Sequence, residues 1–135
     1  MSHITSITIK NYSCGMHTAE EITCHVTTVY RTGKIKHCLF NGLSVAAVKE
    51  YEYIIDKQQC EAFFEFLSDE VKINEWLNDY SVPVCDGWSW DVQIRHSDHS
   101  IKRVSGTVEP PPHGVEIENS IRRLVRFKKR PWLFS

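Results

Sequence analysis

The chain has 135 residues, of which 41% are hydrophobic and 24% charged, a composition typical of one globular domain. Its formal net charge of −1 gives no overall attraction to nucleic acid or to an anionic membrane. No apolar run is long enough to span a bilayer, and the first residues lack the apolar stretch of a secretory signal. We therefore expect a cytoplasmic protein that does not contact a membrane and whose five scattered cysteines are free thiols.

The first 55 residues predict a four-stranded antiparallel meander. Alternating or β-branched residues mark each strand, and glycine-containing pairs at residues 32–33 and 41–42 predict tight hairpin turns. The expected strands are residues 4–13, 22–31, 34–40 and 43–55.

Helical spacing begins after Asp56, a residue type that favours the N-cap position. The apolar residues that follow recur at the spacing of one helix face, so we expect Phe63, Phe64 and Leu67 to be buried against the sheet. Residues 73–80 continue the helical spacing on a shifted stripe, which predicts either a kink or a second short helix.

The last third of the chain predicts a hairpin followed by a helix. Residues 88–95 alternate between apolar and polar and pair with residues 101–108. A final amphipathic helix begins with acids and ends in a basic stretch before Pro131, as the helix dipole favours. The predicted architecture is therefore a single α+β domain over residues 1–135, an antiparallel sheet with both helices packed on one face.

Residues 14–25 contain two cysteines and two histidines, which raises the question of a metal site. Cys24 and His25 are neighbours on a strand, so their side chains point to opposite faces and at most one can join a cluster. With a two-residue turn at residues 32–33, His25 lies opposite Phe40, which is no ligand. We therefore predict no metal and no cofactor.

No catalytic residue is predicted either. Residues 96–99 hold two histidines and an aspartate, but polar residues at a hairpin turn are typically solvated. The alternative is a small hydrolase or thiol-dependent enzyme that uses Cys85 or Cys14, with a histidine brought close by the fold. The sequence favours a protein that is not an enzyme.

Charge is unevenly distributed along the chain. Residues 50–86 contain ten acids and two bases, whereas residues 122–130 contain six bases and no acid. The basic stretch is either the end of a helix or a contact surface for a second copy of the chain or an acidic partner. In the second case the candidate binding residues are Arg122, Arg126, Lys129, Trp132 and Phe134.

Two tryptophans on the predicted hairpin, Trp88 and Trp90, also have two interpretations. Strand aromatics are usually core residues, but on a face that no helix covers they would form a binding surface. We therefore expect a regulatory or immunity-type binding module, or a homodimer subunit, whose partner is a protein. Nucleic acid is a weaker candidate, bound through the basic stretch and its aromatic residues.

Overall fold

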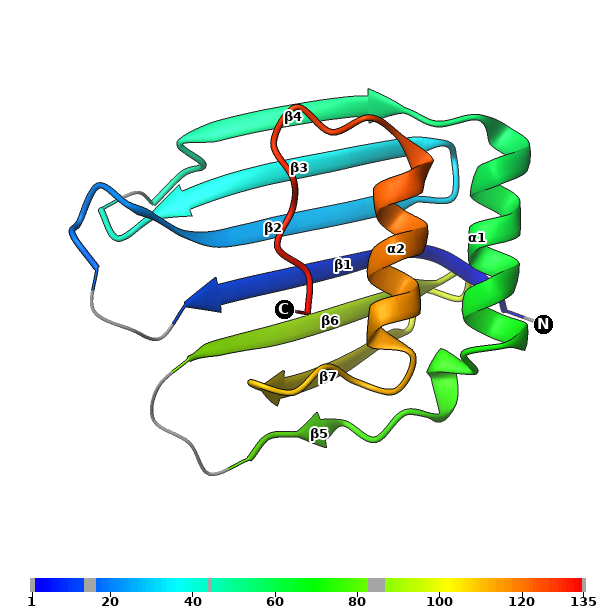
Figure 1. Ribbon diagram of the computed structural model, residues 1–135. Coiled ribbons are helices and arrows are strands. Elements are labelled where there is room, and N and C mark those ends of the chain that lie inside the picture. Colours follow the sequence, from blue (N-terminus) through cyan, green and yellow to red (C-terminus); the bar gives the residue numbers. More distant parts are fainter. Residues whose placement is uncertain (1, 14–16, 44, 83–86, 135) are drawn as a thin grey trace.

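The computed structural model describes residues 2–13, 17–43, 45–82 and 87–134, which form a seven-stranded sheet with two helices on one face (Figure 1). The strand order is β4-β3-β2-β1-β6-β7-β5, and only the β5–β7 pair is parallel among the described strands. The strands are β1 (Ile4–Ser13), β2 (Ile22–Tyr30), β3 (Lys34–Asn41), β4 (Lys49–Ile54), β5 (Asp79–Tyr80), β6 (Trp88–His96) and β7 (Ile101–Thr107). The helices are α1 (Lys57–Asp69) and α2 (Gly114–Leu124), with a short 3₁₀ turn, η1 (Ile73–Glu75), after α1. The α+β class is confirmed.

The predicted tight turn at residues 41–42 is wrong. Strands β1 to β4 do pair as an antiparallel meander, but β3 ends at Asn41 and β4 begins only at Lys49. A longer loop therefore joins these two strands. It carries the exposed apolar side chains of Leu43, Val45 and Val48, which could not continue β4 with one buried face.

The turn between β2 and β3 has three residues rather than two, and this changes the register. Tyr30 pairs with Lys34, and Gly33 adopts the positive φ of 103° that closes the turn. The pairing is therefore shifted by one residue from the expected one, and His25 lies opposite Leu39. Since side chains alternate between faces, a shift of one residue moves His37 to the same face as His25.

Helix α1 packs its expected face on the sheet. The Asp56 carboxylate accepts a hydrogen bond from the Gln59 N–H at 3.1 Å, which confirms the N-cap. Phe63, Phe64 and Leu67 are all buried, as predicted.

Beyond α1 the prediction holds only in part. Lys72 adopts a left-handed conformation that a helix cannot contain, and the short 3₁₀ helix η1 follows it, in place of a longer second helix. Residues 79–80, expected to be helical, form β5 and pair with β7.

The core lies between the sheet and the two helices. Trp90 has no exposed surface, and its indole packs so closely on Gly106 of the neighbouring strand that a Cβ there would collide with the ring. The indole Nε1–H donates to the Glu109 carbonyl at 2.8 Å. Trp88 is partly buried against the same core. Both tryptophans therefore lie on the covered face.

The chain after α2, residues 125–134, is here called the C-terminal segment. It crosses β4, β3 and β2 on the same face as the helices and reaches β1 (Figure 1). The Lys128 N–H donates to the Tyr53 hydroxyl at 3.0 Å, and the Asn11 side-chain amide donates to the Leu133 carbonyl at 2.8 Å. The segment thus covers the part of the sheet that the two helices leave open.

Within the part of the chain that the structure describes, no helix combines the length and apolar content that a membrane crossing requires.

Candidate functional site

Helix α2 ends at Leu124, six residues before the end of the basic stretch. Only Arg122 and Arg123 lie in its last turn, because Val125 is already extended. The predicted helix ending in Arg126, Lys128 and Lys129 is therefore too long. The helix dipole accounts for the first two bases and not for the four that follow.

The C-terminal segment is anchored at its far end by buried contacts. Leu133 and Phe134 have no exposed surface, and the Phe134 ring packs edge-on against Trp90 with centroids 5.3 Å apart. The Phe134 N–H donates to a carboxylate oxygen of the buried Glu118 at 2.6 Å. The other oxygen of Glu118 lies 3.5 Å from a guanidinium nitrogen of Arg122. One buried carboxylate thus ties the segment to α2.

Arg122 is held from the other side by the segment itself. Its Nη2 donates to the Pro131 carbonyl at 2.8 Å, which fixes the turn that brings residues 126–130 back beside α2. Its Nε is buried and has no hydrogen-bond partner among the described residues. Burial, and then the nearby charge of Arg130, lower the pKa of Arg122, whereas Glu118 raises it.

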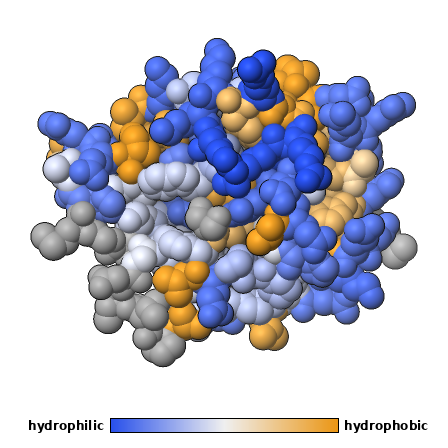
Figure 2. All heavy atoms as spheres, viewed as in Figure 1, coloured by the Kyte–Doolittle hydropathy of each residue, from blue (hydrophilic) through white to orange (hydrophobic). Residues whose placement is uncertain are grey.

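Four arginines converge on one surface hollow of about 370 Å³ as a result. Three of them are exposed, and none of those three pairs with an acid among the described residues. The residues that line this hollow, here called the arginine hollow, are Asn119, Arg122, Arg123, Val125, Arg126, Phe127 and Arg130. Figure 2 shows strongly hydrophilic side chains gathered where α2 passes into the C-terminal segment.

A like-charged cluster of this kind is electrostatically unfavourable without a counter-charge. A guanidinium group presents a rigid fork of N–H donors that matches a carboxylate. The arrangement is therefore suited to binding an anionic group.

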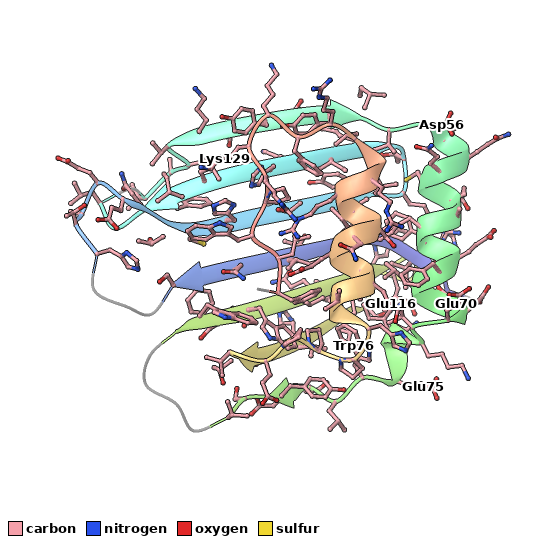
Figure 3. The ribbon with its side chains drawn as sticks, in the orientation of Figure 1. Asp56, Glu70, Glu75, Trp76, Glu116 and Lys129 are labelled. Atoms are coloured by element: carbon pink, nitrogen blue, oxygen red, sulfur yellow. The ribbon has the colours of Figure 1, made fainter. Side chains whose placement is uncertain are left out.

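The seven predicted binding residues do not form one surface. Arg122 and Arg126 lie together in the arginine hollow. Lys129 lies on the same segment but on the side away from α2 (Figure 3). Trp88 is partly buried and Trp90 fully buried, so Trp90 offers no surface to a partner in this conformation.

The two tail aromatics also face inward. Phe134 has no exposed surface. Trp132 keeps 37% of its surface exposed and stacks on the imidazole of His25, with ring centroids 4.3 Å apart. The tail thus docks on its own domain.

Sequence reasoning missed Arg123 and Arg130 as members of the hollow. Both belong to the basic stretch of residues 122–130, which is the sequence feature that could have indicated them. A helix extended to residue 129, however, does not bring residues 122 and 130 together. The bends at residues 125 and 128–129 do, and the hydrogen bond from Arg122 to the Pro131 carbonyl holds the returning chain beside α2.

A second missed feature is a buried pair of histidines under the C-terminal segment. His25 and His37 are both 0% exposed, and His25 Nδ1 lies 3.1 Å from His37 Nε2. The Trp132 backbone N–H also donates to His25 Nδ1, at 3.1 Å. Since His25 Nδ1 accepts from the Trp132 N–H, it carries no proton, and neutral His25 is the Nε2–H tautomer. His37 is therefore the donor in the contact between the two rings, through its Nε2.

The surroundings of the pair keep both rings neutral. Burial, the adjacent His37 and then Lys129 lower the pKa of His25 to about 3. Burial and then Lys129 lower the pKa of His37 to about 4. The outer nitrogens, His25 Nε2 and His37 Nδ1, are buried without partners among the described residues. The pair is a packing element that holds Trp132.

The described residues support neither a metal site nor a reactive thiol. In the described part of the chain, no three His, Cys, Asp or Glu side chains converge so as to hold a metal ion. Cys24 and His25 do point to opposite faces. Burial raises the pKa of the Cys24, Cys38 and Cys60 thiols, the opposite of what a nucleophile needs. Cys14 and Cys85 lie outside the described residues.

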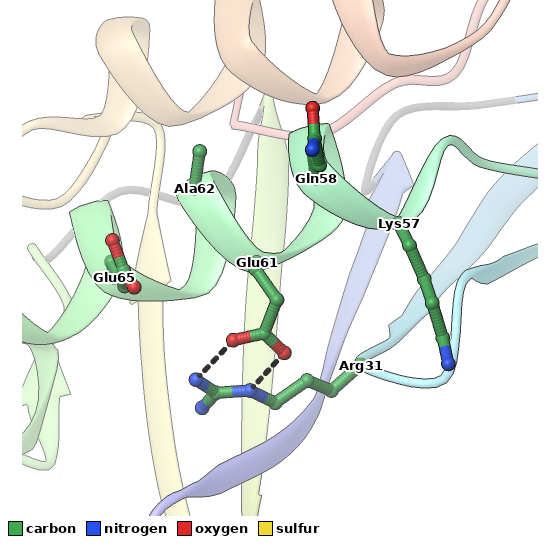
Figure 4. Close-up of a pocket in the computed structure, with 6 residues that line it drawn as sticks. All are labelled: Arg31, Lys57, Gln58, Glu61, Ala62 and Glu65. Atoms are coloured by element: carbon green, nitrogen blue, oxygen red, sulfur yellow. Dashed lines mark hydrogen bonds and ion pairs between the residues drawn. The ribbon is translucent and has the colours of Figure 1, made fainter.

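A second surface hollow, between the β2–β3 turn and α1, contains a bidentate ion pair. The Arg31 guanidinium binds the Glu61 carboxylate through two hydrogen bonds, both of 2.9 Å (Figure 4). The pair raises the pKa of Arg31 and lowers that of Glu61, so each group satisfies the other. The arginine hollow differs because its exposed arginines have no such acid.

Comparison with known protein families and with curated proteins finds no match to this chain.

Proposed function

We propose that this protein is a non-enzymatic binding module that recognises an acidic segment of a partner protein through the arginine hollow. The observation that carries the proposal is the convergence of Arg123, Arg126 and Arg130, unpaired among the described residues, around Arg122 with its unpartnered Nε. Carboxylates of a partner would supply the missing counter-charge to the three exposed arginines.

Protein is favoured over nucleic acid for two reasons. The net charge of −1 and the acidic stretch of residues 50–86 would repel a long polyanion beyond the hollow itself. Stacking platforms for bases are absent from the described surface of the hollow, since Trp132 stacks on His25 and Phe127 packs edge-on against Tyr53.

Enzymatic activity is the weaker alternative. A thiol-dependent enzyme or hydrolase would have to use Cys14 or Cys85, for which no base has been assigned. Among the described residues that line it, the arginine hollow offers positive charge but no nucleophile and no general base.

The proposal is tested by reversing charge in the hollow. Fluorescence anisotropy with a labelled polyglutamate peptide should give saturable, salt-sensitive binding to the parent protein. The double variant Arg126→Glu, Arg130→Glu should weaken it by about tenfold or more. A matched control is Arg95→Glu, Arg103→Glu, because both residues are exposed on the opposite face of the sheet and the change in charge is the same.

Equal loss of binding in the two double variants would mean that only total charge matters, and the proposal would be wrong. Light scattering on the same samples tests the other predicted partner, a second copy of the chain. A dimer that dissociates in the Arg126→Glu, Arg130→Glu variant alone would make self-association the function of this surface.

A further inference from the structure

A shallow hollow between α1 and α2 adjoins the arginine hollow. Its volume is about 370 Å³, and it is lined by Gln59, Ala62, Phe63, Phe66, Ser120, Arg123 and Leu124. Phe66 and Leu124 are only partly buried against the core, so apolar surface remains open here. The two hollows share Arg123, which makes them one continuous surface.

Arg123 joins two chemically different halves. An arginine side chain can lay its aliphatic stem on apolar surface while its guanidinium stays with polar groups. Beside it, Leu124 and Phe66 offer apolar contact on one side, and Arg126 and Arg130 offer positive charge on the other.

The far side of α1 limits how a ligand can lie. Ala62 lines both the hollow between the helices and the hollow that contains the Arg31–Glu61 pair, and its side chain points away from that pair (Figure 4). The hollow beyond it contains two bases and two acids, Arg31, Lys57, Glu61 and Glu65, and therefore offers carboxylates no excess of positive charge. An acidic ligand is therefore held best on the arginine side. The space between the helices is lined, apart from Arg123, by apolar and uncharged polar side chains, so an uncharged side chain of the ligand suits it.

We infer that the partner is recognised through a short acidic stretch of a protein that carries one bulky apolar side chain beside its carboxylates. The carboxylates occupy the arginine hollow, and the apolar side chain lies between α1 and α2 against Phe66 and Leu124. This inference rests on the proposed function and adds an apolar subsite to it. The two contacts together fix the direction in which the partner segment lies.

The test uses two labelled peptides, one with several glutamates beside a phenylalanine and the same peptide with phenylalanine replaced by alanine. The parent protein should bind the phenylalanine peptide about tenfold more tightly, as partial burial of one aromatic side chain implies. In the variants Ala62→Gln and Ser120→Gln, which fill the hollow from either helix, that difference should disappear. Ser68→Gln is the matched control, since Ser68 is exposed on α1 outside the hollow and should leave the difference unchanged.

Equal affinity of the two peptides for the parent protein, with binding still lost in the Arg126→Glu, Arg130→Glu variant, would overturn the apolar subsite and leave the proposed function standing. A phenylalanine preference that survives in both Ala62→Gln and Ser120→Gln would also overturn it, because the ring would then bind elsewhere. No binding of either peptide to the parent protein would overturn the subsite and the proposed function together.

Discussion

Mild acid is predicted to destabilise this protein through His25 and His37. Both rings are neutral in the fold, with pKa values lowered to about 3 and about 4, whereas a histidine in an unfolded chain has a pKa of about 6.5. Between these values the unfolded chain binds protons that the folded chain does not. The contribution to stability is therefore complete above about pH 6.5 and is lost progressively as the pH falls towards 4. Lys129 and Tyr51 are the other titratable groups close to the pair.

The magnitude follows from the size of the pKa shifts. At about pH 5 the pH is about 1.5 units below the pKa of an unfolded imidazole, whereas at about pH 7.5 it is above it. Each unit of pH below that pKa lowers the free energy of unfolding by about 1.4 kcal/mol per histidine. Each histidine then lowers the free energy of unfolding by about 2 kcal/mol, and the pair by about 4 kcal/mol. This is a large share of the total stability of a domain of this size.

Urea unfolding followed by circular dichroism at the two pH values measures the effect. The variant His37→Gln keeps an N–H donor for His25 and removes one titrating ring, so it should show about half of the pH dependence. The claim that both histidines are neutral in the fold would be refuted in either of two cases. The free energy of unfolding of the parent protein would fall by less than about 1 kcal/mol over this range, or the variant would show the full pH dependence.

Replacing Phe134 by Ala should lower the free energy of unfolding by about 3 kcal/mol, because the ring is fully buried against Trp90. Urea unfolding measures this change, and an unchanged midpoint would mean that the C-terminal segment is not docked on the sheet. Gly106→Ala should cost about 1–3 kcal/mol, since the new methyl group meets the indole of Trp90, whereas Gly42→Ala has room and should stay within about 0.5 kcal/mol. Loss of the helix cap in Asp56→Ala should cost about 1 kcal/mol, and a melting temperature equal to that of the parent would contradict the cap. All five cysteines should react with an alkylating agent under non-reducing conditions after unfolding, and mass spectrometry that finds a protected pair would disprove the free thiols.

Much of the fold follows from local patterns in the sequence. The order of β1 to β4, the cap at Asp56 and the buried face of α1 each depend on residues that are close in the chain. Such features are read correctly because the periodicity of a strand or helix and its capping residue point to the same structure.

The errors arise where one residue decides a longer-range arrangement. Counting two residues instead of three in the β2–β3 turn placed His37 on the wrong face, which hid its contact with His25. Extending α2 beyond Leu124 hid the return of the chain that gathers the arginines. Neither a turn length nor a helix end is fixed by periodicity alone, because tertiary contacts such as that between Arg122 and Pro131 select them.

The position of the C-terminal segment has a consequence for the order of events during synthesis. Asn11 on β1 bonds to Leu133, 122 positions later in the chain, and the rings of Trp132 and Phe134 complete the packing over β2 and β6. The inner face of β1 and β2 therefore stays uncovered until residues 131–134 have been synthesised. Contacts of such long sequence separation slow folding and leave apolar surface exposed in the meantime. We expect nascent chains that stop before residue 131 to remain bound to chaperones, and chains that include residues 131–134 to be released from them.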